Sequence, residues 1–109
     1  MVVETKKGNL PVRYGMNALA LYGDLTNKPM NDVMKSLGNL TSMKLSEVLA
    51  FIYVGFVDGA RYAKEECKVA STDEVGDMLD DDPELMNKMI EAYSDQAPPA
   101  TEGGKSKKD

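Results

Sequence analysis

Residues 13–34, RYGMNALALYGDLTNKPMNDVM, decide the fold of this chain. Apolar side chains in the first half of this stretch recur every three or four residues; they are Tyr14, Ala18, Leu21, Tyr22 and Leu25. This spacing lines one face of a helix. Asn27 and Pro29 end the pattern, because a proline disfavours helical backbone in the residue before it. The apolar pattern then resumes, so the stretch predicts a helix over residues 13–25, a tight turn, and a second helix over residues 29–37.

The third predicted helix is the most apolar element of the chain. Residues 48–57 leave almost no polar face, and the helix is expected to continue to about Glu66. Thr41 or Ser42 could cap its start, and a later start at Leu45 stays open. A helix that is apolar on all sides is either central to the fold or covered by a partner. Central burial is the default expectation.

Two further helices are predicted on either side of the acidic triplet Asp80–Asp82. Ser71 is a good N-cap, and Glu74 three residues later completes a capping box, which predicts the start of the fourth helix. Residues 85–93 carry the apolar face of the fifth helix. The three acids are consecutive and precede Pro83, whereas a calcium loop needs alternating oxygen ligands. We therefore interpret the triplet as a favourable charge at a helix start and expect no metal site.

The two ends of the chain are predicted to be non-helical. Residues 1–12 contain a turn at Gly8 that suits positive φ, so a short β-hairpin is expected there. Residues 96–109 show no apolar periodicity and are expected to form a disordered tail. The expected fold is mainly α: a small single-domain bundle of about five helices over residues 1–95, with the N-terminal hairpin.

The composition argues against enzyme chemistry. The chain has 109 residues, enough for one domain with a single modest core. It contains no histidine, the most frequent general base near neutral pH and the commonest metal ligand. Cys67 is the only cysteine, so an internal disulfide or a cysteine-based zinc cluster cannot form. We expect a non-catalytic protein that uses no cofactor and no metal.

The charge distribution and the apolar runs limit the partners. The net charge is −5, and residues 65–95 hold eleven acidic and two basic residues. Such a surface repels phosphate backbones, so nucleic acid is not an expected partner. The apolar run of residues 48–57 is much shorter than the roughly 20 residues of a membrane-spanning helix. The N-terminus shows no secretory signal. We therefore expect a cytoplasmic protein without a membrane partner.

Four residues at the start of the first helix form a [FY]G-x-x-AL pattern: Tyr14, Gly15, Ala18 and Leu19. The turn Thr26-Asn27 follows this helix. The stretch resembles the tail assembly chaperones of long-tailed bacteriophages, which commonly begin with a short turn-containing segment that leads into such a helix. The later segments LSEVLAFIYVGFVDG and DEVGDML also look like helices of that family, so the resemblance covers about residues 2–92.

The resemblance implies a small helical protein that coats the long, apolar, helical tape measure protein until tail-tube subunits polymerise around it. Its partners would be the tape measure protein and the tail tube protein. It would act in the cytoplasm of the bacterial host cell and be absent from the mature virion. Individual contacts with the client would be weak. Repeated along a long client, they would give avidity and still allow tail-tube subunits to displace the chaperone.

Six apolar residues are candidates for contact with this client: Met16, Phe51, Tyr53, Phe56, Met86 and Met89. Methionine adapts to varied apolar partners, but core packing explains each of the six at least as well. Polar substitution of Phe51 or Tyr53 is expected to weaken client binding more than fold stability.

Two other functions stay open. The first two helices could mimic the helix-turn-helix of a DNA-binding regulator of phage origin, although the second offers only Asn31 and Lys35 for reading bases. The chain could also be a plain oligomerisation module that uses its third helix as the interface. Whether it forms a homo-oligomer is left open.

Overall fold

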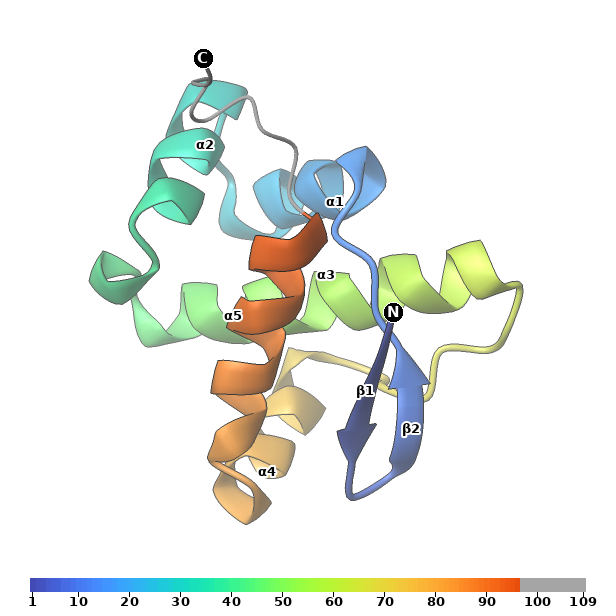
Figure 1. Cartoon of the computed structure of the whole chain (residues 1–109). Helices are drawn as coiled ribbons and strands as arrows, with labels where there is room; N and C mark the ends of the chain where they lie inside the picture. Colours follow the sequence, from blue (N-terminus) through green and yellow to red (C-terminus); the bar gives the residue numbers. More distant parts are fainter. Residues whose placement is uncertain (97–109) are drawn as a thin grey trace.

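The computed structural model describes residues 1–96 and contains a hairpin and five α-helices (Figure 1). In chain order the elements are β1 (Val2–Thr5), β2 (Gly8–Pro11), α1 (Met16–Thr26), α2 (Met30–Gly38), the 3₁₀ turn η1 (Leu40–Ser42), α3 (Leu45–Ala63), α4 (Thr72–Asp81) and α5 (Glu84–Gln96). The expected fold class is confirmed, hairpin included. The predicted tail over residues 96–109 lies outside the described residues, except for Gln96 at the end of α5.

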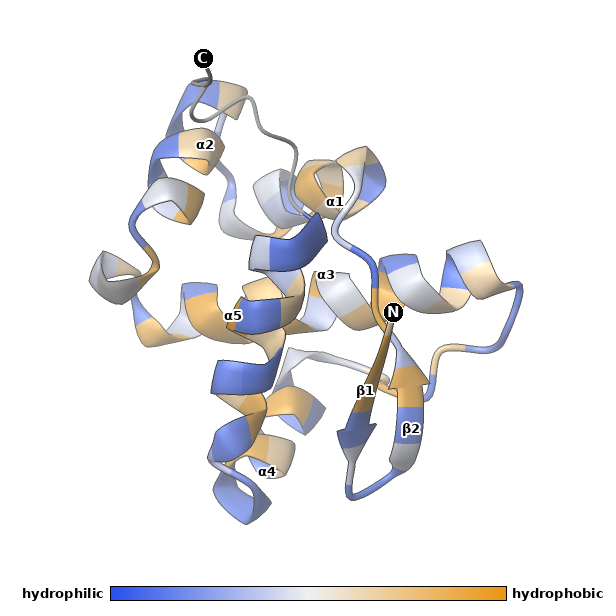
Figure 2. Ribbon diagram, in the orientation of Figure 1, coloured by the Kyte–Doolittle hydropathy of each residue, from blue (hydrophilic) through white to orange (hydrophobic). Residues whose placement is uncertain are grey.

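Helix α3 is the centre of the fold. Figure 1 shows it running across the molecule, and α1, α4, α5 and β2 all pack against it. Its buried residues are Ala50, Phe51, Ile52, Val54, Gly55, Phe56, Asp58, Gly59 and Ala60. Helix α5 crosses α3 and presents mainly hydrophilic residues to the viewer in Figure 2. The default expectation of a centrally buried third helix is confirmed.

The hairpin has a two-residue turn and an antiparallel register that tolerates a proline. Gly8 adopts φ +105°, the positive φ that the sequence predicted. Pro11 lies opposite Val2. The next pair is hydrogen-bonded, because the Val12 N–H donates to the Met1 carbonyl oxygen over 2.8 Å. Bonded and non-bonded pairs alternate, so Pro11 stands where the ladder needs no N–H donor.

Helix α1 begins at Met16, three residues later than the sequence predicted. The preceding residues make bonds to α3 instead of to one another. The Arg13 N–H donates to the Gly55 carbonyl oxygen over 3.0 Å, and the Gly15 N–H donates to Asp58 Oδ2 over 3.1 Å. These tertiary bonds hold residues 13–15 out of the helix. Apolar periodicity carries no information about such distant partners.

Helix α3 also differs from its predicted bounds at one end. It begins at Leu45, the later of the starts that the sequence left open. It ends at Ala63 and not near Glu66, because Lys64 adopts the left-handed conformation with φ 61°. The Lys64 N–H then bonds back to the last turn. The predicted N-cap of α4 is confirmed, since Ser71 Oγ accepts from the Glu74 N–H over 3.3 Å.

An aromatic cluster joins residues 13–15 to α3 and α5. The Tyr14 ring stacks on Phe51 with centroids 4.8 Å apart and meets the Tyr93 ring edge-on at 5.5 Å. The Tyr14 hydroxyl donates to the Phe51 carbonyl oxygen over 2.8 Å. Gly55 leaves the room for this approach on α3, and Gly59 does the same for the backbone of Pro11 and Val12. A Cβ at Gly55 would lie 2.5 Å from the Tyr14 ring.

Candidate functional site

Seven large apolar side chains are exposed among the described residues: Met1, Val2, Met16, Leu25, Met30, Leu45 and Tyr62. Single exposed apolar residues are normal on soluble proteins, whereas a group of them around a hollow marks a binding surface. Three of the seven, Met1, Val2 and Tyr62, line one groove of about 500 Å³. We call it the hairpin groove.

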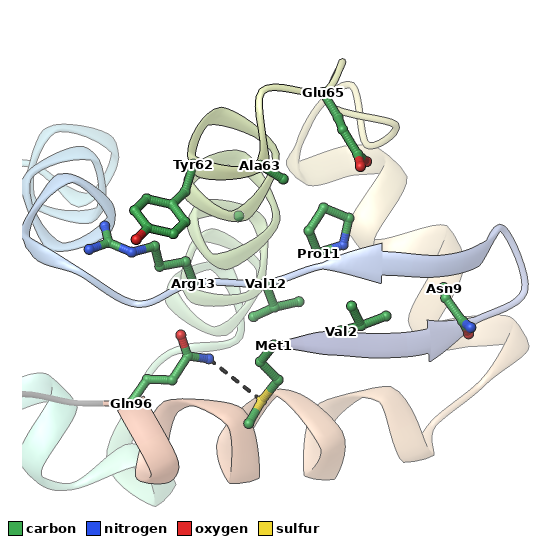
Figure 3. A pocket seen from close by; sticks show the side chains of 11 residues that line it. Met1, Val2, Asn9, Pro11, Val12, Arg13, Tyr62, Ala63, Glu65 and Gln96 are labelled. Atoms are coloured by element: carbon green, nitrogen blue, oxygen red, sulfur yellow. Dashed lines mark hydrogen bonds between the residues drawn. The ribbon is translucent and has the colours of Figure 1, made fainter.

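The walls of the hairpin groove come from three parts of the chain that are far apart in sequence. Figure 3 shows Tyr62 and Ala63 at the end of α3, Val2 and Pro11 on the hairpin, and Gln96 at the end of α5. The Val2 side chain is 59% exposed, and the Tyr62 ring is 66% exposed. The lining combines apolar side chains with the polar side chains of Asn9, Arg13, Glu65 and Gln96, so the groove suits an amphipathic partner.

A buried carboxylate, Asp58, binds Arg13, which lines this groove. Asp58 is 2% exposed and accepts hydrogen bonds from Arg61 Nη2 over 2.7 Å, from the Gly15 N–H over 3.1 Å and from Arg13 Nη1 over 3.4 Å. A buried charge is tolerated only with such partners. The Arg13 guanidinium also lies 4.3 Å from the centre of the Tyr62 ring. Through Arg13, this cation–π contact links the exposed Tyr62 ring to the buried Asp58 carboxylate.

The groups with a shifted pKa do not line the hairpin groove. Burial raises the pKa of Tyr14 and Tyr22 above the ordinary value. A hydrogen bond from Lys28 lowers the pKa of Glu47, and one from Lys7 lowers the pKa of Glu74. Each shift is explained by packing or by a surface ion pair. Within residues 1–96, no three His, Cys, Asp or Glu side chains gather closely enough to hold a metal ion.

The six sequence-predicted contact residues are scattered, and none of them lines the hairpin groove. Met16 is 61% exposed at the start of α1. Tyr53 and Met86 are half-buried. Phe51, Phe56 and Met89 are buried in the core, which is the alternative that the sequence left open. For Phe51, the expected separation of client binding from stability therefore does not follow, because a polar side chain there would disrupt the core.

Sequence reasoning missed the residues that form the groove. Val2 carried a usable signal, because neighbouring residues of a strand point to opposite faces. Since Val3 is buried, Val2 must face outward. Tyr62 lies beyond the apolar run of α3, in the turn where the helix leaves the core. That Tyr62 and Met1 line the same groove could not be predicted from local sequence.

None of the helices within residues 1–96 combines the length and the hydropathy needed to cross a membrane. Comparisons of the chain with protein-family models, with curated proteins and with solved structures gave no match.

Proposed function

We propose that this protein is a non-catalytic tail assembly chaperone of a long-tailed phage. It binds and shields apolar helical segments of the tape measure protein while the tail tube assembles. The observation that carries the proposal is the hairpin groove, an amphipathic hollow on a small helical domain where Met1, Val2 and Tyr62 are exposed. The pattern of residues 13–34 supplies the link to phage tails.

The hairpin groove suits the recognition of a helix. Its volume of about 500 Å³ lies in the range of pockets that bury a sizeable ligand. An amphipathic helix lays its apolar face in such a groove through anchors at i, i+3 or i+4, and i+7. The Tyr62 ring offers a large flat contact at small entropic cost, because it is already held by Arg13. Each contact is modest, and many copies along one client would act together.

We also propose where the protein acts and how its second partner, the tail tube protein, takes part. The protein acts in the cytoplasm of the host cell, is displaced when tail tube protein polymerises around the client, and is absent from the mature virion. Neither of the other functions gains support. The apolar residues of α3 are mostly buried, which leaves little of that helix for an oligomer interface.

Co-expression with the tape measure protein of the same gene neighbourhood tests the proposal. The full chain is expected to keep that protein in the soluble fraction and to copurify with it. The Val2→Ser, Tyr62→Ser double variant should lose both effects while keeping its helical circular dichroism, since both side chains are exposed. Leu25→Ser is the matched control, because Leu25 is exposed on α1 and does not line the groove. Equal solubility with and without the wild-type chain would contradict the proposal.

A further inference from the structure

A second groove lies between the start of α3 and the outer face of α4. It has a volume of about 430 Å³, and its floor is made by Leu45, Leu49 and Leu79. We call it the α3–α4 groove. Leu45 and Tyr62 are separated along α3 by about 25 Å at 1.5 Å per residue, so the two grooves lie at opposite ends of this helix. They share none of their lining residues.

The floor of the α3–α4 groove is open to an apolar partner. Leu45 is 68% exposed, and Leu49 and Leu79 are half-buried. Gly76 contributes no side chain, and a Cβ built there would have Leu49 Cδ1 as its nearest neighbour at 3.8 Å. The glycine therefore leaves the floor wide at its middle.

Carboxylates line one rim of this groove. Asp73, Asp77 and Asp80 contribute to it from α4 at the spacing i, i+4 and i+7, which is one helical face. Within the described part of the chain these three carboxylates take part in no ion pair. Two other acids of the same segment are paired: Glu74 binds Lys7, and Asp82 binds Lys88.

We propose that the α3–α4 groove binds a basic amphipathic helix of a partner protein. Leucine-like side chains of that helix lie on the leucine floor, and its lysines or arginines face the acidic rim. From Asp73 to Asp80 the rim extends about 10 Å, or two helical turns, which matches cations at i, i+4 and i+7 of a helix alongside. Phosphate-bearing partners are disfavoured, because the carboxylates repel them.

This inference goes beyond the proposed chaperone function, because it depends neither on the hairpin groove nor on a phage client. It assigns the sign of charge that a second partner segment carries. A helical client with both an apolar and a basic amphipathic segment would engage both ends of α3 at once.

A labelled peptide of leucine and lysine is the direct probe, about 15 residues long so that it forms four helical turns. Leucine recurs at helical spacing, and lysine fills the flanks. We expect fluorescence anisotropy to show binding to the full chain that weakens with added salt. The same peptide with glutamate in place of lysine should bind at least about tenfold more weakly. Equal binding of the two peptides would overturn the proposal.

A triple variant and its control test whether the peptide binds at the acidic rim. Asp73→Asn, Asp77→Asn, Asp80→Asn should weaken binding of the lysine peptide about tenfold, the sum of three exposed charge pairs. The control variant Asp24→Asn, Glu66→Gln, Glu91→Gln removes equal charge from exposed sites elsewhere and should leave the affinity unchanged. An equal loss in both variants would reduce the effect to net charge and overturn the assignment.

The contribution of the leucine floor is tested at Leu45, with the exposed Leu25 on α1 as the control. Leu45→Ser should weaken binding of the lysine peptide about tenfold, whereas Leu25→Ser, a matched change on α1, should not. Unchanged affinity of Leu45→Ser would overturn the assignment.

The chain's own C-terminal lysines are the competing occupant. If they fill the groove, Lys105→Ser, Lys107→Ser, Lys108→Ser would raise the affinity for the lysine peptide, and the partner helix would be replaced by an internal contact. Under the proposal that variant binds the peptide as the wild-type chain does. The hairpin-groove variant Val2→Ser, Tyr62→Ser should also bind it normally, which keeps this test separate from that of the chaperone function.

Discussion

Gly59→Ala should destabilise the protein strongly, although an alanine normally stabilises a helix. A Cβ at position 59 would lie 2.5 Å from the Val12 nitrogen and closer still to the Pro11 carbonyl group. These are backbone atoms of the segment that leads from the hairpin to α1, and no side-chain rotation can relieve the clash. The segment would have to move away from α3 by about 1 Å to reach ordinary van der Waals contact.

The change in the free energy of unfolding caused by Gly59→Ala is the sum of three contributions. Replacing glycine by alanine within a helix gains about 1 kcal/mol of unfolding free energy. Moving the segment away strains the hydrogen bond from the Arg13 N–H to the Gly55 carbonyl oxygen, and this strain lowers the free energy of unfolding by about 1 kcal/mol. Overpacking of the tight contact costs about 3 kcal/mol, the upper end of the usual range, because backbone must shift. The net loss is about 3 kcal/mol, or a fall in Tm of roughly 10–20 °C.

Gly76→Ala is the matched control, since Gly76 also lies inside a helix, but a Cβ there would make only an ordinary van der Waals contact, with Leu49 Cδ1 at 3.8 Å. It should gain up to about 1 kcal/mol from helix propensity alone. Urea unfolding followed by helical circular dichroism measures both variants, with the m-value as a check that the unfolded state is unchanged. If the two variants shift the urea midpoint equally, the close approach of residues 11 and 12 to α3 is wrong.

Three other predictions rest on separate contacts. Asp58→Asn should lower the free energy of unfolding in urea by about 2–3 kcal/mol, because the buried side chain keeps its size but loses the charge that pairs with two arginines and a backbone N–H. Unchanged stability would contradict the role of Asp58 in holding these groups together. Burial raises the pKa of Tyr14 well above its ordinary value of 10.0, so the unfolded state ionises first and stability should fall as pH rises through that value. Tyr14→Phe should cost about 1 kcal/mol at neutral pH but remove its share of the alkaline loss, and equal alkaline loss in both proteins would refute this. Phe51→Ser should lose more than about 3 kcal/mol and Tyr62→Ser about 1 kcal/mol, since one ring is 3% and the other 66% exposed; comparable losses by thermal unfolding would count against the assigned burial.

The elements of the fold were predictable because their signals are local. Pro29 marks the break between α1 and α2, Ser71 and Glu74 mark the start of α4, and Gly8 marks the hairpin turn. The start of α1, by contrast, was wrong because it depends on distant partners. Residues 13–15 stay out of α1 because α3 supplies their hydrogen-bond acceptors, at Gly55 and Asp58.

The candidate site was much less predictable than the fold. Apolar residues such as Phe51 and Met89 look the same in sequence whether they fill a core or bind a client, and burial separates them only once α5 is placed on α3. The hairpin groove joins Met1, Tyr62 and Gln96, which are far apart in the chain. No periodicity within one element can report a surface that three elements build together.

Photocrosslinking shows whether the hairpin groove contacts the client. A benzophenone amino acid in place of Tyr62 places the reactive group at the rim of the hairpin groove, and the same group in place of Leu25 serves as the control on α1. In cells expressing the whole gene neighbourhood, we expect irradiation to link position 62, but not position 25, to a very long helical protein that mass spectrometry identifies. Crosslinks of equal yield at both positions, or none at position 62 to any such protein, would contradict it.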